Sequence, residues 1–351
     1  MRIARLSCIA AMTAAVLGAV SFGLPAAARD LTVTDVGGAT QEKHRQIYYD
    51  PWKSKTHETL VEDSWDNGLG VLRAKMQGGG DPGWDIVLVT NDEALIGCQE
   101  GLYEKLDWSK LGGKDAFLPM AINDCGVAVG IYTTLFAYDS KRTNGDLKSW
   151  ADFWDVTKFP GKRGLYREAQ YNLEFALLAD GVPAADVYKV LDTPEGVDRA
   201  FAKLGELKPY IIWWEAGSQP AQLLASGEVA ATSIYSTRLF AAKKEAPSFV
   251  GVWDGNVYSA DFWVIMKGSP NIAKAQDLLN FMTRPETQAA YANISTTGPS
   301  NKAGSALVDK KIEPDSPTAP EHLAAGLPLG AQFWADHSDE LNQRFTAWLG
   351  E

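Results

Sequence analysis

Short apolar segments with the pattern of β-strands alternate, in the first third of the chain, with longer segments in which apolar residues recur at helical spacing. Strands are expected at residues 31–36, 58–62 and 85–89, and helices between them at residues 39–55 and 69–77. A sheet built from such strand–helix repeats is mostly parallel and has its carboxyl strand ends, with any ligand crevice, on one side. This part of the chain is therefore predicted to form one α/β lobe.

The same alternation returns in the second third of the chain and predicts a second α/β lobe. Between the two, residues 126–138 form an apolar, β-branched run longer than a typical strand, which we expect to pass from one lobe into the other. The elements expected in the second lobe are strands at residues 164–166, 210–213 and 229–235, and helices at residues 150–154, 170–180, 185–208, 219–225 and 238–244.

The chain returns to the first lobe through residues 250–267, whose two halves are rich in β-branched and aromatic residues, with turn residues at 254–256 between them. A lobe inserted between two halves of another is joined to it by more than one strand, and such hinge strands let the lobes close on a ligand. We expect lobe one to comprise residues 29–134 and 260–305, and lobe two to comprise residues 135–259 and 306–351.

The last part of the chain is predicted to contain two helical regions and a connector. Ser269 followed by proline is typical of a helix start, and residues 333–349 form an amphipathic segment. Residues 302–330 are rich in Pro, Gly, Ala and Ser, and we expect them to form an extended connector.

Asp261 stands out because it is a carboxylate in an otherwise apolar strand, beside Tyr258, Phe262 and Trp263. Burying a charge is costly unless something pairs with it. Asp261 is therefore expected either to face a cleft and meet a cationic ligand framed by aromatic rings, or to lie at a strand end facing water.

Residues 1–28 have the pattern of a secretory signal peptide. Basic residues precede an apolar run that ends in Pro25 and three alanines, so cleavage is expected after Ala28. No later segment is long and apolar enough to span a bilayer. The mature protein is therefore expected to be exported and soluble.

Composition narrows the range of partners. Without the two arginines of residues 1–28, 31 basic and 44 acidic residues leave a net charge of −13. This charge argues against nucleic acid, whose binding depends on basic residues. It suits a cationic ligand, although an acidic composition also serves the solubility of an exported protein.

Two cysteines remain in the mature chain, Cys98 and Cys125. In an oxidising compartment a disulfide between them would close a loop of about 27 residues and add roughly 3 kcal/mol of stability; two buried free thiols are the alternative. Neither belongs to a Cys-x-x-Cys pair and the histidines are scattered, so we expect no metal site.

The chain carries no recognisable enzyme motif: it has no Gly-x-Ser-x-Gly elbow, no His-Glu-x-x-His and no phosphate-binding loop. It is instead rich in aromatic residues, with 12 Trp and 12 Tyr. Trp213 and Trp214 end one predicted strand of lobe two, Tyr235 ends the next, and Glu168 and Tyr171 follow a third. Acidic and aromatic side chains at one edge of the sheet favour a cleft that binds an amine.

Several motifs resemble the periplasmic polyamine-binding proteins of ABC importers, the spermidine/putrescine-binding type of extracellular solute-binding protein. The most specific are Asp261, Phe281-Met282-Thr283-Arg284-Pro285 and Gly298-Pro299-Ser300-Asn301, and the likeness covers nearly the whole mature chain. Other matching segments are residues 33–38 with Gln41, 84–87, 97–107 and 226–229. The resemblance implies the two-lobed periplasmic binding protein (Venus-flytrap) fold, each lobe a mostly parallel sheet flanked by helices.

Carried over residue by residue, the resemblance implies a ligand site drawn from both lobes. Asp261 matches the amine-binding aspartate of the family, Glu168 matches an acidic position in lobe two, and Tyr235 stands where polyamine binders place a tryptophan. The remaining candidates lie on adjoining loops and strand ends: Thr90, Asn91, Ser218, Arg238, Tyr171, Trp214 and Gly38.

Some positions depart from the pattern of the family: Ser259 in place of a tryptophan, Tyr171 at a second acidic position, glycines 37 and 38 in place of an aromatic pair, and Arg238 as an added cation. The site has lost one acid and gained one cation relative to the family. This change fits a ligand with one amine and one carboxylate, or a monoamine, about as well as it fits a long polyamine. Arg238 could equally form a salt bridge to Glu168 or Glu215.

The sequence therefore predicts a monomeric periplasmic protein, without a cofactor, that captures a polyamine or related amine-bearing solute between two lobes and delivers it to the permease of an ABC importer. Binding of an amino-acid-like or opine-type zwitterion in the same fold is one alternative. Another is an exported enzyme that uses Asp261 and Glu168 as paired carboxylates. An exported receptor that signals without transporting a solute is a third.

Overall fold

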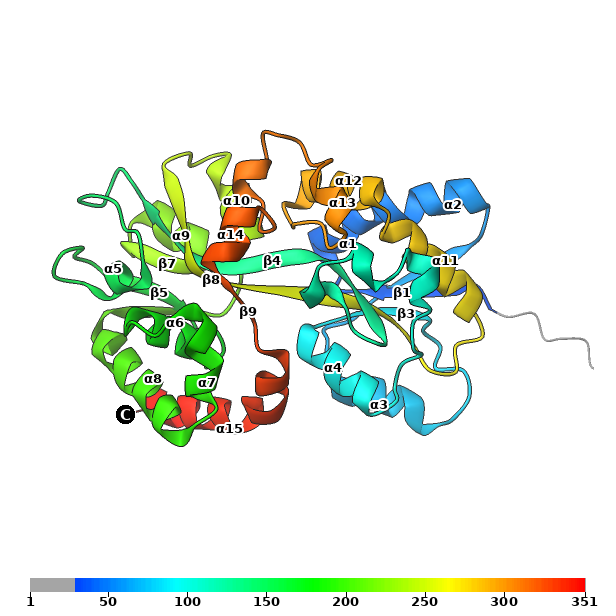
Figure 1. Ribbon diagram of the computed structural model, residues 1–351, viewed down its shortest axis with the longest axis horizontal. Coiled ribbons are helices and arrows are strands. Elements are labelled where there is room, and N and C mark those ends of the chain that lie inside the picture. Colours follow the sequence, from blue (N-terminus) through cyan, green and yellow to red (C-terminus); the bar gives the residue numbers. More distant parts are fainter. Residues whose placement is uncertain (1–28, 351) are drawn as a thin grey trace, which may run out of the picture.

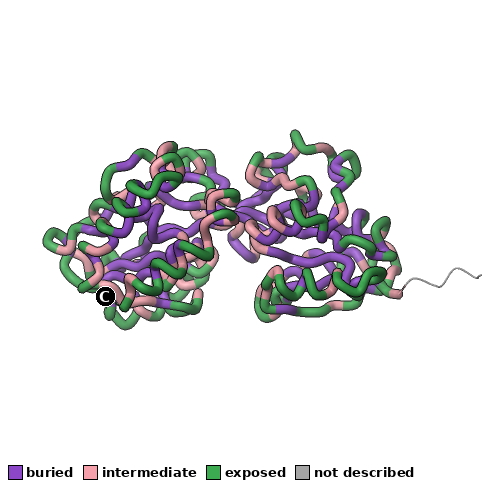
Figure 2. Tube along the Cα trace, turned by 90° about the horizontal axis from the view of Figure 1, so that it is seen from below, coloured by how far each residue is buried: buried purple, intermediate pink, exposed green. Residues whose placement is uncertain are grey.

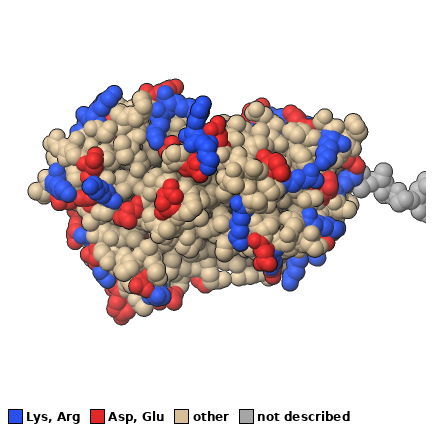
Figure 3. All heavy atoms as spheres, turned by 45° about the horizontal axis from the view of Figure 1, so that its top comes forward, with Lys and Arg blue, Asp and Glu red and all other residues tan. Residues whose placement is uncertain are grey.

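The computed structural model describes residues 29–350, so the predicted signal peptide lies outside the described residues. Helices lie above and below a central sheet (Figure 1), and the chain forms two lobes joined by a narrow waist (Figure 2). Within this part of the chain, no helix combines the length and the apolar character needed to cross a membrane. Acidic and basic side chains are interspersed over the face shown in Figure 3.

The described residues contain one mixed sheet with the order β2-β1-β3-β8-β4-β7-β5-β6, and β9 beside β8. The strands are β1 (Leu31–Asp35), β2 (Leu60–Ser64), β3 (Ile86–Val89), β4 (Gly126–Asp139), β5 (Arg163–Tyr166), β6 (Ile211–Trp214), β7 (Ala231–Tyr235), β8 (Phe249–Ile265) and β9 (Leu327–Pro328). Pairing is parallel among β2, β1 and β3 in one lobe and among β6, β5 and β7 in the other. Antiparallel pairing of β8 with β3 and of β4 with β7 and β8 joins the two halves.

Helices cover both faces of the sheet, and most of the predicted strand–helix units are confirmed. The helices of lobe one's first half are α1 (Gly38–His44), the π-helical segment Arg45–Tyr49, α2 (Asp50–Thr56), α3 (Leu69–Gln77) and α4 (Asn91–Gln99). Those of lobe two are α5 (Trp150–Trp154), α6 (Asn172–Ala179), α7 (Val187–Leu191), α8 (Pro194–Leu207), α9 (Gln219–Ser226) and α10 (Ser236–Lys243). The remaining helices are α11 (Ile272–Met282), α12 (Pro285–Ser295), α13 (Lys302–Ser305), α14 (Pro320–Ala325) and α15 (Ala331–Gly350).

β4 and β8 are long strands that run from one lobe into the other (Figure 1). β8 is unbroken, so the turn predicted at residues 254–256 is wrong. The register with β4 shifts there, and residues 253–256 form an irregularity instead of a turn. The turn-forming side chain of Asn256 is fully buried and donates to the carbonyl oxygens of Trp253 and His322, both at 2.8 Å, which satisfies the backbone of the irregular segment.

Two further expectations are wrong in detail. Helix α11 begins at Ile272, three residues after Ser269, and the Ser269 hydroxyl accepts from the Asn271 N–H at 3.0 Å and donates to Asp85 at 2.5 Å in the turn before the helix. Residues 302–330 are not an extended connector, since they contain α13, α14 and β9. Proline and glycine in that segment start and end short helices, which a composition argument cannot distinguish from a loop.

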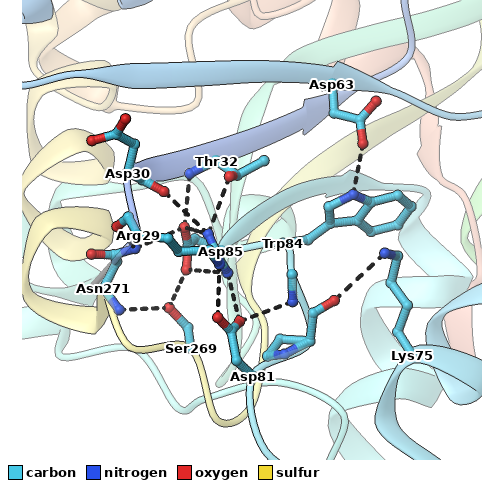
Figure 4. Close-up of polar contacts among 12 residues, drawn as sticks. Arg29, Asp30, Thr32, Asp63, Lys75, Asp81, Trp84, Asp85, Ser269 and Asn271 are labelled. Atoms are coloured by element: carbon cyan, nitrogen blue, oxygen red, sulfur yellow. Dashed lines mark hydrogen bonds and ion pairs between the residues drawn. The ribbon is translucent and has the colours of Figure 1, made fainter. Parts of the chain in front are cut away.

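Arg29 and Asp85 tie the start of the described chain to the amino end of β3 (Figure 4). Asp85 is fully buried. Its carboxylate accepts hydrogen bonds from the Arg29 guanidinium (2.6 and 3.0 Å), the Thr32 N–H (2.7 Å), the Ser269 hydroxyl (2.5 Å) and the Asn271 amide (3.2 Å). Arg29 also forms an ion pair with Asp81 at 2.8 Å. The amino end of this lobe is therefore held by a fully paired buried carboxylate.

Each lobe has its own hydrophobic core. One core is drawn from residues 31–131 and 260–291, and the other from residues 136–257 and 327–345. Cys98 and Cys125 form a disulfide, which confirms the predicted pairing. The boundaries given above for the two lobes stay a prediction.

Candidate functional site

The carboxyl ends of parallel strands from both lobes meet where β4 and β8 cross between the lobes. β1 and β3 end at Asp35 and Val89, and β5 and β7 end at Tyr166 and Tyr235. Ligands of open α/β sheets bind at such ends. Two adjoining cavities lie here, one of about 310 Å³ and one of about 170 Å³.

We call the larger cavity the mixed-charge chamber. It is lined by one face of α1, by the start of α10 and by the crossing strands, through Ala39, Thr40, Lys43, His44, Thr237, Arg238, Ala241, Gly130, Tyr132 and Asp261, among others. We call the smaller cavity the acidic chamber, and its lining includes Thr90, Asn91, Asp92, Glu168, Gln170 and Tyr171. Tyr132 and Tyr235 line both cavities, with their rings edge to face at 6.3 Å.

Asp261 lies on β8 directly opposite Gly130 of β4 and faces the mixed-charge chamber. Among the described residues, Tyr132 alone donates a hydrogen bond to its carboxylate, at a long 3.4 Å, and no cation pairs with it. Burial therefore dominates and raises the pKa of Asp261 to about 7, although the Tyr132 hydroxyl acts in the opposite direction. The missing side chain of Gly130 makes room for Thr297, because a Cβ at position 130 would lie 3.0 Å from the Thr297 hydroxyl oxygen.

Lys43 of α1 and Arg238 of α10 bring positive charge to the same chamber from opposite lobes. Neither forms an ion pair within residues 29–350. The proposed salt bridges of Arg238 are wrong, because Glu215 pairs with Arg167 at 2.6 Å and Glu168 accepts from the Tyr166 hydroxyl at 3.0 Å. Burial lowers the pKa of Lys43, and the charges of Arg238 and Lys244 lower it further.

The acidic chamber contains carboxylates and no lysine or arginine among its lining residues. Burial raises the pKa of Glu168, the Tyr166 hydroxyl partly offsets this, and the charge of Asp92 adds to it. Thr90 donates to Asp92 at 2.6 Å and caps α4 together with Glu93. The expected polar loop of lobe one is therefore present at the cavity wall.

The structure places the other candidates in different positions. Tyr171 lines the acidic chamber and has a positive φ of 69°, an unusual backbone conformation for a bulky residue. Trp214 is buried behind Tyr235, with ring centroids 5.7 Å apart, and lines neither chamber. Ser218 is exposed beside α9, and Gly38 is exposed at the start of α1; they line neither chamber, although Ala39 next to Gly38 does.

The arrangement separates the two acids that an enzyme reading would pair. Asp261 lines the mixed-charge chamber and Glu168 lines the acidic chamber, with Tyr132 and Tyr235 between them. Among the described residues, no group of three or more His, Cys, Asp and Glu side chains is placed to hold a metal ion.

Sequence reasoning missed many of the lining residues, among them the polar Lys43, His44, Asp92 and Tyr132. Lys43 lies four positions after Ala39, so helical spacing from the glycine turn could have placed it on the same face. His44 is fully buried and its Nδ1 lies 2.7 Å from the Asp35 carboxylate. Tyr132 carried no signal, because only its pairing with Ser259 across β4 and β8 directs it to the cavity.

Comparison with known proteins agrees with this architecture. The pattern of the bacterial extracellular solute-binding protein family matches residues 57–322. The chain belongs to that family. It is 44% identical, over 93% of its length and 94% of the relative, to a gamma-aminobutyric acid-binding protein of Pseudomonas aeruginosa.

Two further relatives show the breadth of the family around this solute-binding protein. A spermidine/putrescine-binding periplasmic protein of Escherichia coli is 23% identical over 81% of this chain and 87% of the relative. The solved structure of the Atu4243–GABA receptor superimposes with a TM-score of 0.83 at 32% identity, covering 92% of this chain and 98% of that one. The predicted two-lobed fold and the predicted role as a solute-binding protein of the ABC-transporter type are thereby confirmed.

Proposed function

We propose that this solute-binding protein captures a small zwitterion, with an ammonium group at one end and a carboxylate at the other, for which γ-aminobutyric acid is the simplest candidate. The observation that carries the proposal is the mixed-charge chamber. It brings the half-buried carboxylate of Asp261, the half-buried Lys43 and the exposed Arg238 to one cavity of about 310 Å³, and none of the three forms an ion pair within residues 29–350. Buried charges without partners are costly, so a ligand that supplies both counter-charges is favoured.

In this proposal Asp261 binds the ammonium group and Arg238 binds the carboxylate. Arg238 suits the second role because a guanidinium can donate two parallel hydrogen bonds to a carboxylate. The Tyr132 and Tyr235 rings flank the space between them, and cation–π contact with the ammonium contributes about 0.5–2 kcal/mol. The 44% identity to a protein named for γ-aminobutyric acid supports the same solute class.

The positions of Asp261, Lys43 and Arg238 also distinguish between the other solutes that were considered, the polyamines and the opine-type zwitterions. A polyamine would place a second ammonium group towards Arg238 and Lys43, where like charges repel it, so putrescine and spermidine are disfavoured. An opine-type zwitterion keeps both counter-charges and stays within the proposed class. Glu168, Asn91, Thr90 and Tyr171 line the acidic chamber and would contact the amine-bearing end of a larger solute.

We further propose that the protein acts in the periplasm as a monomer and presents its closed, loaded form to the permease of an ABC importer, without a catalytic step. The likeness to periplasmic and ABC-type binding proteins supports this setting. The lobes defined by the sequence, residues 29–134 with 260–305 and residues 135–259 with 306–351, would be the bodies that close.

Isothermal titration calorimetry of the mature protein with γ-aminobutyrate, putrescine, butyrate and butylamine tests the proposal. We expect γ-aminobutyrate to bind most tightly, because only this compound satisfies both ends of the chamber. The bound solute should be recovered unchanged after denaturation, whereas an enzyme would return a product. Tighter binding of putrescine than of γ-aminobutyrate would contradict the proposal.

A further inference from the structure

Lys43 and Arg238 are like charges that approach one another across the opening between the lobes. Lys43 projects from α1 of lobe one and Arg238 from α10 of lobe two, and both line the mixed-charge chamber. Neither has an ion pair among the described residues, and the same holds for Lys244, which directly follows α10, whereas Lys243 at the end of α10 pairs with Asp315 at 2.7 Å. Lobe closure must bring these positive charges closer together.

The helix faces that carry the two cations are otherwise made of small side chains. Besides the buried His44, the other lining residues are Ala39 and Thr40 on α1, and Thr237 and Ala241 on α10. Such faces allow close approach, so steric bulk does not hold the lobes apart at this point. Electrostatic repulsion between Lys43 and Arg238 opposes the approach instead. Lys43 is half-buried, and its pKa is lowered first by burial and then by the positive charges of Arg238 and Lys244.

We propose that Lys43 and Arg238 form an electrostatic gate, which closes over a solute only when a solute carboxylate lies between the two cations. This inference rests on the proposed function and adds to it: Lys43 becomes a specificity-determining residue, and the carboxylate becomes the group that drives closure. Butylamine, which can pair only with Asp261, would bind without closing the lobes.

The gate predicts a dependence on salt in the absence of any solute. At about 10 mM salt the screening length is about 30 Å, and at about 1 M it is about 3 Å, so added salt removes the repulsion. Small-angle X-ray scattering of the solute-free mature protein should therefore show a smaller radius of gyration at high salt. Lys43→Met, which keeps a long side chain and removes the charge, should already be compact at low salt.

Binding supplies the second arm of the test. In Lys43→Met the preference for γ-aminobutyrate over butylamine, taken as the ratio of the two dissociation constants, should fall by about tenfold, because one carboxylate contact is lost and butylamine is no longer repelled. Lys55→Met is the matched control, since Lys55 is an exposed lysine of α2, without an ion pair among the described residues, and lines neither chamber. It should leave the ratio and the radius of gyration unchanged.

The outcomes separate this inference from the proposed function. If γ-aminobutyrate binds and compacts the protein, but butylamine compacts it equally and Lys43→Met leaves the ratio unchanged, the gate is refuted and the zwitterion site stands. If γ-aminobutyrate does not bind at all, the proposed function fails, and the salt-dependent compaction still decides whether the gate exists.

Discussion

Asp85 and Asp261 are two aspartates of the same lobe, at opposite ends of the β3–β8 pair, the first fully buried and the second half-buried. Asp85 precedes β3 at its amino end, and Asp261 lies on β8 next to Phe262, which pairs with the last residue of β3. Asp85 accepts five hydrogen bonds, two of them from a guanidinium. Asp261 accepts one long hydrogen bond from Tyr132 and faces a cavity.

The difference separates a structural carboxylate from a binding carboxylate. Both side chains lose water on folding, which costs free energy unless partners replace it. Arg29 and its neighbours offset that cost for Asp85 within the protein itself. For Asp261 the cost is not offset, so its pKa rises to about 7. A cationic ligand that pairs with this carboxylate would offset the cost, which favours binding. Four experiments would break or sharpen this contrast.

The largest effect is expected from Asp85→Ala. Removing the buried carboxylate leaves the Thr32 N–H, the Ser269 hydroxyl and the Asn271 amide without their acceptor, although Arg29 keeps Asp81, and such changes cost about 3–5 kcal/mol. Urea unfolding followed by tryptophan fluorescence should show this loss, and Asp30→Ala, at an exposed position, should show almost none. A loss below about 1 kcal/mol would mean that the Asp85 network contributes little to stability.

In contrast to Asp85→Ala, Asp261→Asn should weaken ligand binding and leave the stability of the fold undiminished. A charge-assisted hydrogen bond contributes about 1.5–3 kcal/mol, so the dissociation constant for γ-aminobutyrate should rise by about 10- to 100-fold. The free energy of unfolding should stay the same or increase, because a half-buried charge without an ion pair is removed. Asp254→Asn, on the exposed side of β8, is the control for calorimetry, and equal affinities in the two variants would exclude Asp261 from the site.

The affinity for the zwitterion should depend on pH through Asp261. Its carboxylate must be ionised to pair with ammonium, and its pKa in the free protein is about 7. Binding therefore releases a proton below that pH, and the affinity should fall by up to about tenfold for each unit as the pH drops below 7. In Asp261→Asn the profile should be flat; if it keeps the wild-type slope, another group is responsible.

The smallest effect is expected from Tyr132→Phe. This change removes the hydroxyl that lowers the pKa of Asp261, so the midpoint of the pH profile should move upward. A single hydrogen bond contributes about 0.5–1.5 kcal/mol, and the affinity at neutral pH should fall about two- to tenfold. An unchanged midpoint would show that the long contact between Tyr132 and Asp261 has no energetic weight.

The sequence predicted the fold well because strand–helix periodicity is a local property. It placed β1, β2 and β3 within two residues of their observed ends, and it paired Cys98 with Cys125. It failed at residues 254–256, where turn residues occupy a bulge whose buried amide, Asn256, is satisfied by the distant His322. A local pattern cannot reveal a partner that distant in sequence.

The candidate site was predictable only in part, for the same reason. Asp261 was identifiable as a carboxylate in an apolar strand and Glu168 as an acid just after a strand, but their separation into two chambers depends on Tyr132, whose position follows from strand pairing. Lys43 became visible as a site residue only when α1 and α10 were placed on opposite sides of one cavity. An interaction between charges on two different lobes cannot be recognised from the sequence of either segment alone.

β4 and β8 belong to both lobes, so the chain cannot be divided between the lobes without cutting two paired strands. An isolated half made by severing the chain at the waist would end in two broken strands with open edges, which invites aggregation. Reporter domains for a fluorescent sensor should instead enter at peripheral loops, such as the exposed glycines at residues 78–79, before Asp81 and its ion pair with Arg29. β4 and β8 then stay intact, and the movement of one lobe relative to the other on solute binding would change the fluorescence of the reporter.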